Sequence, residues 1–187
     1  MTAPVLFDQQ LVRQHRQRAA CRYADFAFLK DAAAARLADR LELMRRNFDL
    51  CLDIGAHDGR LAQHFARLGK IGHMIQTDPA EKFANAAKKH GSSVVHELAD
   101  LPYKPESFDA VFSCLSLHWV DDLPGLMMQA RQLLKPDGLL LVSLLGGCSL
   151  TELKQALAEA EQAVTGGFSP RCAPMADIRD IGGLLSR

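Results

Sequence analysis

The sequence of 187 residues predicts an α/β fold, in which helices cover both faces of a mostly parallel sheet. Three observations support this prediction. Strand-like and helix-like segments alternate from residue 48 onward, and glycine or proline stands at most of their junctions. Hydrophobic residues make up 48% of the chain and charged residues 24%, so one domain of this length can bury a core.

The first part of the chain, residues 5–46, is expected to be helical. It includes a strongly basic stretch, Leu6–Ala20, and Asp31 is a candidate N-cap for the alanine-rich helix that follows. We therefore predict two parts, an amino-terminal helical segment over 1–47 and a ligand-binding domain over 48–187.

The elements of the second part follow from hydrophobic periodicity and turn residues. Strands are predicted at 49–54, 72–77, 93–97, 108–114 and 138–145. Helices are predicted at 59–68, 80–89, 123–134 and 150–164, and a short helix is predicted at Asp177–Leu185.

The most informative segment is Leu52–Arg60, with the sequence LDIGAHDGR, between the first strand and its helix. Gly55 can adopt a positive φ, and Gly59 has no Cβ to obstruct close packing at the helix start. The helix N-terminus also offers free backbone N–H groups at the same place. This pattern indicates a backbone that passes close to a ligand. The alternative is an ordinary tight strand-to-helix turn without a ligand.

Two carboxylates define the kind of ligand. Asp78 follows the second strand, about 20 residues past the turn, where related folds place a carboxylate on a ribose. Asp53 would repel a diphosphate but would attract an ammonium or sulfonium group. His57 replaces the middle glycine of a dinucleotide-binding fingerprint. Asp53 and His57 therefore disfavour a nicotinamide-dependent dehydrogenase.

The pattern Asp53-x-Gly55-x-x-x-Gly59 resembles motif I of class I S-adenosylmethionine-dependent methyltransferases, whose sheet is Rossmann-like. The resemblance implies S-adenosylmethionine as the cofactor, with Asp53 on the methionine ammonium side. The turn from Gly55 through Ala56 to Gly59 would wrap the ribose and methionine portions, and Asp78 would hold both ribose hydroxyls.

A second contact region resembles the adenine site of the same family. The Glu97 carboxylate would accept the adenine amino group, and the Leu98 N–H would meet a ring nitrogen. The family more often has Asp-Ala here, and Asp100 is the competing assignment for Glu97.

The segment from Ser113 to Trp119 includes the end of the fourth strand and the residues after it, and it is expected to border the cofactor's methyl group. His118 is a candidate to orient a substrate or take a proton, or else a hydrogen-bonded structural histidine. For Trp119 we favour core packing over a substrate-facing wall. The sulfonium is already activated, so no catalytic residue is assigned.

A narrower resemblance spans about residues 13–171. Its segments are HRQRAA, ADFAFLK, LSLHWVDDLPG, LKPDGLLL, LLGG and GGFSPR. They resemble the respiratory complex I assembly factor of methyltransferase fold and its bacterial relatives. The malonyl-carrier-protein methyltransferase of biotin synthesis is a looser match. The assembly factors usually have an acidic residue where this chain has Cys148.

This resemblance leaves the reaction and the acceptor open. Methyl transfer is the first hypothesis, with an unknown acceptor that includes a protein subunit of complex I among the candidates. The alternative is an assembly factor that binds S-adenosylmethionine and acts by protein docking or by arginine hydroxylation. The basic stretch Gln9–Arg22 would be the docking element, or a solvated helix that covers the cofactor.

Composition restricts the remaining possibilities. The net charge is zero and the pI is about 7, which argues against a nucleic-acid partner. No apolar run reaches the length of a transmembrane helix. The five cysteines are scattered without C-x-x-C spacing, so we expect reduced thiols in the cytoplasm and no metal site. Cys51 and Cys114 are expected in the core.

The class I sheet has two strands more than the sequence supplies. We expect a fragment, the alternative being a sheet that dispenses with them.

Overall fold

The computed structural model describes residues 5–167, 169 and 171–186, and it forms two compact units, Met1–Leu144 and Leu145–Arg187. The first four residues of the segment 1–47 and two residues of the stretch GGFSPR lie outside the described residues. The boundary predicted at residue 47/48 remains a prediction about domain organisation.

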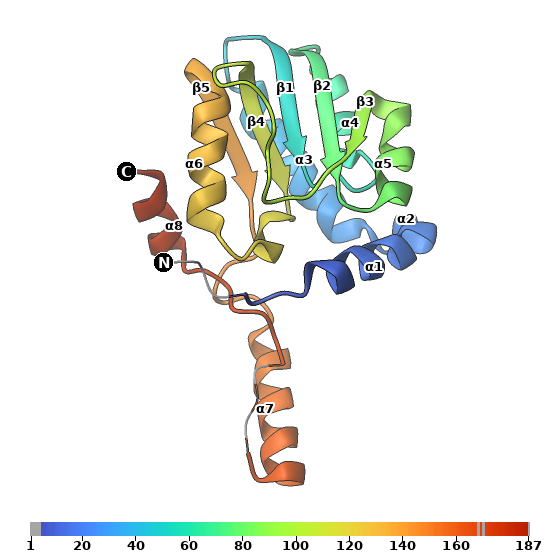
Figure 1. Ribbon diagram of the computed structural model, residues 1–187, viewed down its shortest axis with the longest axis vertical. Helices are drawn as coiled ribbons and strands as arrows, with labels where there is room; N and C mark the ends of the chain where they lie inside the picture. Colours follow the sequence, from blue (N-terminus) through green and yellow to red (C-terminus); the bar gives the residue numbers. More distant parts are fainter. Residues whose placement is uncertain (1–4, 168, 170, 187) are drawn as a thin grey trace. The chain divides into compact units, whose positions relative to one another are not determined.

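The first unit alternates strands and helices, as expected (Figure 1). Its helices are α1 (Gln9–Ala19), α2 (Tyr23–Phe26), α3 (Phe28–Glu42), α4 (Arg60–Ala66), α5 (Glu81–Ala87) and α6 (Leu123–Leu133). Its 3-10 turns are η1 (Ala20–Arg22), η2 (Lys88–His90) and η3 (Leu117–Trp119). Its strands are β1 (Phe48–Ile54), β2 (Ile71–Asp78), β3 (Ser92–Val95), β4 (Phe108–Cys114) and β5 (Leu134–Ser143).

The five strands form one parallel sheet in the order β3-β2-β1-β4-β5. Helix α6 lies on one face, and α3 and α4 lie on the other (Figure 1). The predicted Rossmann-like α/β fold is confirmed. Because the strands are parallel, their carboxyl ends all lie at the same end of the sheet, which we call the carboxyl edge. Helix α1 runs across the carboxyl edge (Figure 1).

Several strand boundaries differ from the prediction, and two of the differences change where residues of interest lie. β3 ends at Val95, so Glu97 lies in the following loop rather than within the strand. β5 begins at Leu134, because its pairing with β4 continues through an irregular register between Phe108 and Ala110. The turn residues Pro136 and Gly138 therefore lie inside the strand.

The core between α3, α4 and the sheet is built from side chains of both layers. Phe65 of α4 packs edge-on against Phe112 of β4, with the ring centroids 4.9 Å apart. Cys51 and Cys114 are buried there, as predicted. Burial raises the pKa of the Cys51 thiol to about 12, so this thiol behaves as a small apolar group.

The prediction that Asp31 caps the alanine-rich helix was wrong. α3 begins three residues earlier, and its N-cap is Ala27. The Asp31 carboxylate instead accepts hydrogen bonds from Arg60 and His64 of α4, at 3.3 and 3.1 Å. These bonds tie α3 to α4 on their shared face of the sheet.

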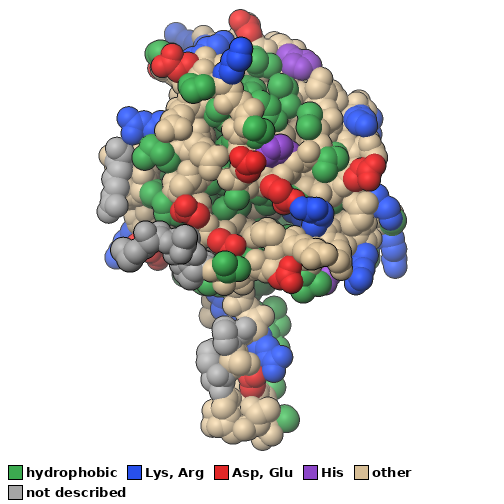
Figure 2. Space-filling model, viewed as in Figure 1, with side chains coloured by type: hydrophobic (Ala, Val, Ile, Leu, Met, Phe, Trp, Pro, Cys, Tyr) green, Lys and Arg blue, Asp and Glu red, His purple; other side chains and the backbone are tan. Residues whose placement is uncertain are grey.

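On the face of the first unit shown in Figure 2, basic side chains are interleaved with acidic ones rather than gathered in one patch. This arrangement agrees with a chain that holds 22 basic and 22 acidic residues. Within the described residues, every helix is too short or too polar to cross a membrane.

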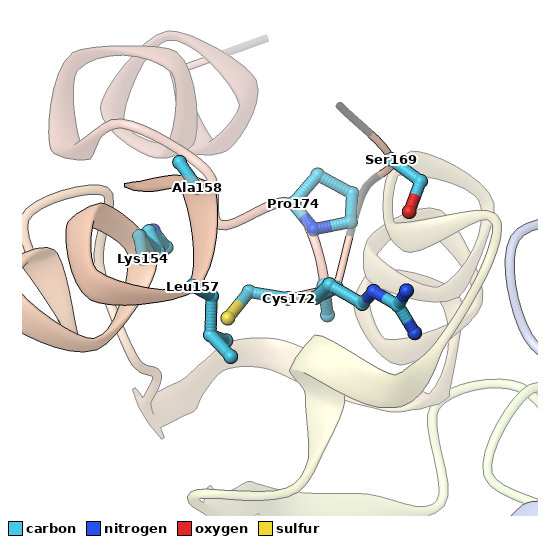
Figure 3. Close-up of a pocket in the computed structure, with 8 residues that line it drawn as sticks. Lys154, Leu157, Ala158, Ser169, Cys172 and Pro174 are labelled. Carbon is cyan, nitrogen blue, oxygen red and sulfur yellow. The ribbon is translucent and has the colours of Figure 1, made fainter. Parts of the chain in front are cut away.

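The second unit contains α7 (Thr151–Thr165) and α8 (Ile178–Leu185), close to the two predicted helices. Glu161 of α7 accepts hydrogen bonds from Ser169 and Arg171, which holds the following loop against the helix. This unit also contains a pocket of about 200 Å³ whose lining includes the neighbouring side chains of Leu157 and Cys172 (Figure 3).

Candidate functional site

The glycine turn after β1 is shaped by a close approach of three loops. Gly55 has a φ of 74°, and a Cβ there would lie only 2.4 Å from Ser116 Cβ, after β4. It would also lie 3.2 Å from a methyl group of Leu98, after β3. The loops that follow β1, β3 and β4 therefore meet at Gly55, and a larger residue does not fit there.

Backbone bonds fix the same turn to β2. The N–H groups of Gly55 and Ala56 both donate to the Thr77 carbonyl, at 2.9 Å each. Gly59 is the N-cap of α4 with a φ of 81°, and a Cβ there would lie 2.8 Å from Gln76 Oε1. Both glycines thus satisfy requirements that the sequence predicted for them.

Asp53, at the end of β1, is a buried carboxylate that accepts no hydrogen bond from the described residues. Its side chain is fully buried, and neither oxygen has a hydrogen bond from any described residue. Burial raises its pKa to about 7, although the Lys30 ammonium opposes the shift. A buried, unsatisfied carboxylate is costly, so this position suits a ligand that brings a positive donor.

Asp78, at the end of β2, is also fully buried but is well satisfied. It accepts the backbone N–H groups of His57 and Ala80, at 3.0 and 2.9 Å. Arg16 of α1 donates to both of its oxygens, with Nε at 3.3 Å from Oδ1. The predicted ribose carboxylate therefore holds an arginine in this structure.

Lys30 of α3 is a buried ammonium beneath the glycine turn. Its Nζ donates to the Gly55 carbonyl at 2.9 Å and lies 2.5 Å from His57 Nδ1. Burial lowers the Lys30 pKa to about 8, and Asp53 opposes this shift. Burial, Lys30 and Arg16 hold the His57 pKa well below its usual range, so the imidazole is neutral.

The ring of His57 is enclosed by aromatic side chains. It stacks on Tyr23 with centroids 5.1 Å apart and meets the edge of Phe83 at 4.9 Å. These rings, with Arg16 and Trp119, line a pocket of about 240 Å³ beneath α1. The pocket lies beside the glycine turn, because His57 belongs to both.

The adenine candidates lie in the loop after β3. Glu97 is partly exposed and forms an ion pair with Arg13 of α1, while Leu98 is buried. Asp100 is exposed, and the structure does not decide between it and Glu97 as a ligand. Together, Arg13 and Arg16 place α1 over both regions that the resemblance assigns to the cofactor.

The end of β4 and the segment after it contain the remaining candidates. Ser113 is buried and its hydroxyl donates to the Ile54 carbonyl at 2.6 Å, a bond between neighbouring strands. His118 Nδ1 is buried and has no partner among the described residues. Burial, together with Arg16 and Lys30, lowers the His118 pKa to about 4. This histidine is therefore neutral at pH 7.

Core packing of Trp119, the role favoured from the sequence, was wrong. The side chain is 37% exposed and meets the ring of Phe7 edge-on at 5.5 Å. The segment after β4 leaves the sheet as a 3-10 turn, which carries Trp119 to the rim of the pocket beneath α1. The alternative role, a wall that faces the ligand, agrees with this position.

Sequence reasoning missed Arg16, Lys30 and Tyr23 as members of the site. Arg16 reaches Asp78 across 62 positions, and Lys30 reaches Gly55 across 25. They lie on helices before the first strand and share no local motif with the turn. Two signals pointed to this part of the chain. HRQRAA and ADFAFLK, which contain Arg16 and Lys30, belong to the narrower resemblance, and Gln9–Arg22 was a candidate for a helix that covers the cofactor.

Comparison with known proteins agrees with this geometry. Residues 52–142 match a family described as a methyltransferase domain. The Mus musculus protein named arginine-hydroxylase NDUFAF5, mitochondrial, is 40% identical over 97% of this chain and 54% of its own length. A malonyl-[acyl-carrier protein] O-methyltransferase 1 of Coxiella burnetii is 31% identical over 96% of this chain and 60% of its own length. The chain thus spans little more than half the length of these relatives.

Among solved structures, an S-adenosylmethionine-dependent methyltransferase of Thermotoga maritima aligns with a TM-score of 0.66 at 22% identity. The alignment covers 92% of this chain and 78% of that one. At this identity the likeness concerns the fold, and it agrees with the sheet order and with the family match. The chain is therefore similar to methyltransferases in two respects: residues 52–142 match the methyltransferase domain, and the sheet has the Rossmann-like fold of the solved methyltransferase structures.

Proposed function

We propose that this protein binds S-adenosylmethionine at the carboxyl edge of its sheet and transfers the methyl group to an acceptor. The observation that carries the proposal is Asp53, a fully buried carboxylate whose two oxygens lack any partner among the described residues. The cofactor's amino-acid end carries an ammonium group, which would satisfy this carboxylate.

The neighbouring residues fit the rest of that cofactor. The Gly55–Gly59 turn, including Ala56, leaves its backbone open to close approach because no Cβ fits at either glycine. Asp78 is the acceptor for two ribose hydroxyls, and Glu97 and Leu98 are the adenine contacts. Each group lies at the carboxyl edge, where parallel sheets bind ligands.

When bound, S-adenosylmethionine supplies a methyl group already activated by its sulfonium centre. The chain's residues then have to orient the acceptor and exclude water. His118 is the candidate for orientation, since its imidazole is neutral and its Nδ1 has no hydrogen-bond partner among the described residues. In the tautomer with an unprotonated Nδ1, it can accept a hydrogen bond from an N–H or O–H of the methyl acceptor. Trp119 is the candidate wall beside it.

A second function has its own observation. The relative with 40% identity over 97% of this chain is named an arginine hydroxylase. The second candidate is therefore an assembly factor that binds S-adenosylmethionine and acts on a protein partner, a complex I subunit among the candidates, without methyl transfer. Both candidates share the same cofactor site.

Calorimetric titration tests the shared site. S-adenosylhomocysteine should bind in the micromolar range, while NAD should give no measurable binding. Asp78→Asn should weaken S-adenosylhomocysteine at least tenfold, since each charge-assisted hydrogen bond contributes about 1.5–3 kcal/mol. Asp137→Asn, at an almost fully exposed carboxylate, is the matched control. Tighter binding of NAD than of S-adenosylhomocysteine would refute the proposal.

Cofactor bearing a labelled methyl group separates the two functions. Label transferred to a protein or small molecule of a cell extract supports methyl transfer. Binding of the cofactor without any transfer, together with an oxygen-dependent mass gain on an arginine of a captured protein, supports the second function.

A further inference from the structure

Asp78 cannot hold both its present partners and a ribose. A carboxylate has about four acceptor positions. The backbone N–H groups of His57 and Ala80 use two of them, and Arg16 uses the others through Nε and a terminal nitrogen. Two ribose hydroxyls would need the positions that Arg16 occupies, so Arg16 has to leave Asp78 when the ribose binds.

Arg16 cannot simply be left without an anion. Its side chain is only 7% exposed and lies over the ring of Phe83, with the guanidinium carbon 5.7 Å from the centroid. An unpaired guanidinium at such a position is strongly unfavourable. The guanidinium therefore needs either a new anion within reach or release of the helix that carries it.

Contacts at both ends keep α1 in place. The N–H groups of Leu6 and Phe7, just before the helix, donate to Asp121 at 2.8 and 3.0 Å. Near its other end, the Gln17 side chain accepts the N–H of Lys82 at 3.1 Å. A change of partner by one side chain preserves these contacts, whereas release of the helix would break them.

The guanidinium already reaches toward the glycine turn. One terminal nitrogen of Arg16 lies 3.3 Å from His57 Nδ1, which is itself 2.9 Å from the Gly55 carbonyl. The guanidinium thus lies between Asp78 and the part of the turn assigned to the amino-acid end of the cofactor. Arg16 and His57 both line the pocket of about 240 Å³, which gives the side chain room to move.

We propose that Arg16 is a ligand-binding residue that changes partner, leaving Asp78 to the ribose and pairing with the α-carboxylate of the cofactor's amino-acid end. This inference rests on the proposed cofactor site. The exchange keeps the Arg16 guanidinium paired with an anion, because the ligand brings the carboxylate that replaces Asp78. The Asp78 carboxylate stays satisfied by hydrogen bonds, from the two backbone N–H groups and the ribose hydroxyls. It also gives the basic helix α1 a role in distinguishing ligands that carry this carboxylate from those that lack it.

The test compares S-adenosylhomocysteine with its decarboxylated analogue, which keeps the adenosine, the thioether and the amine. Calorimetry gives the ratio of the two dissociation constants in the wild-type protein and in Arg16→Gln. We expect the preference for the carboxylate-bearing ligand to fall at least fivefold in the variant. The analogue should bind the variant as well as or better than the wild type, since Asp78 is released from its ion pair.

Arg13→Gln is the matched control, because Arg13 lies on the same helix and pairs with Glu97 rather than Asp78. It should leave the ratio within twofold of the wild type. Arg16→Met is a second test variant in case Arg16→Gln does not fold. A merely structural role of Arg16 would weaken both ligands equally and leave the ratio unchanged.

A fall in the ratio of less than fivefold in the Arg16 variants overturns the inference, and so does an equal fall in Arg13→Gln. Absence of binding by the wild type to either ligand would overturn the proposed cofactor site itself. Binding of S-adenosylhomocysteine with an unchanged ratio would leave that site standing and remove only the role of Arg16.

Discussion

Lowering the pH from 8 to 6 should weaken the binding of S-adenosylhomocysteine through Asp53. Only the ionised carboxylate attracts the ammonium of the ligand. In the free protein, burial raises the Asp53 pKa to about 7, so the carboxylate loses its charge within this range. The sign follows directly: below pH 7 the ligand has to bind a site from which a proton must first be removed.

The magnitude follows from the same pKa. With a value of about 7, the ionised fraction of Asp53 is about nine-tenths at pH 8 and about one-tenth at pH 6. The apparent affinity falls with the fraction of competent sites, so the dissociation constant should rise about tenfold. The ligand's own amine becomes more protonated over this interval, which strengthens rather than weakens its attraction to a carboxylate.

Other titratable groups face the same place and need a control. The Lys30 pKa is lowered to about 8, so Lys30 gains charge below pH 8 and would repel an ammonium. His57 and His118, with pKa values below the interval, stay neutral through most of it. Asp53→Asn retains Lys30 and both histidines, and therefore isolates the contribution of the carboxylate.

Calorimetry at pH 8, 7 and 6 and at constant ionic strength measures the effect. The wild type should show the tenfold loss, and Asp53→Asn should bind weakly at pH 8 with less than threefold further change. A wild-type affinity that stays within twofold, or a variant that keeps the full pH dependence, would refute the assignment of Asp53 to the ammonium.

Two predictions concern stability, measured by urea unfolding. Gly59→Ala and Gly69→Ala both place alanine at a positive φ, which costs about 1–2 kcal/mol. Only at Gly59 does the new Cβ crowd Gln76 and the backbone of α5, so this variant should lose about 1 kcal/mol more, and equal losses would contradict the packing argument. Phe112→Ala should cost about 3–5 kcal/mol, since the ring is fully buried against Phe65. Leu43→Ala, at a side chain 84% exposed, should change stability by less than about 0.5 kcal/mol, and a similar loss in both would contradict the assignment of the core.

The fold was predictable because its signals are local. Strand-like and helix-like segments that alternate, separated by glycine and proline, favour a parallel sheet with helices between the strands. The two glycines of the turn were predictable from the local strand–turn–helix pattern, although the side chains that crowd Gly55, Leu98 and Ser116, come from loops distant in sequence. The order of the strands then brings Asp53 and Asp78 to one edge.

What the sequence did not predict depends on contacts between distant segments. Arg16 and Lys30 are ordinary basic residues of helices until the helices pack over the turn. Trp119 was expected in the core because of its size, but the chain leaves the sheet in a 3-10 turn and carries the ring outward. Asp31 was expected as a cap because of its residue type, but a partner on α4 binds its carboxylate.

The balance of buried charge favours a zwitterionic ligand over a diphosphate. Arg16 and Lys30 supply two positive charges around the turn, and Asp53 and Asp78 supply two negative charges. An amino-acid end adds one charge of each sign, so Asp53 gains an ammonium while Arg16 exchanges one carboxylate for another. A diphosphate would add only negative charge next to two carboxylates, at a site whose cations are already needed. The discrimination against dinucleotides therefore arises from Asp53 together with the pairing of Arg16, and removal of Asp53 alone should not create a site for NAD.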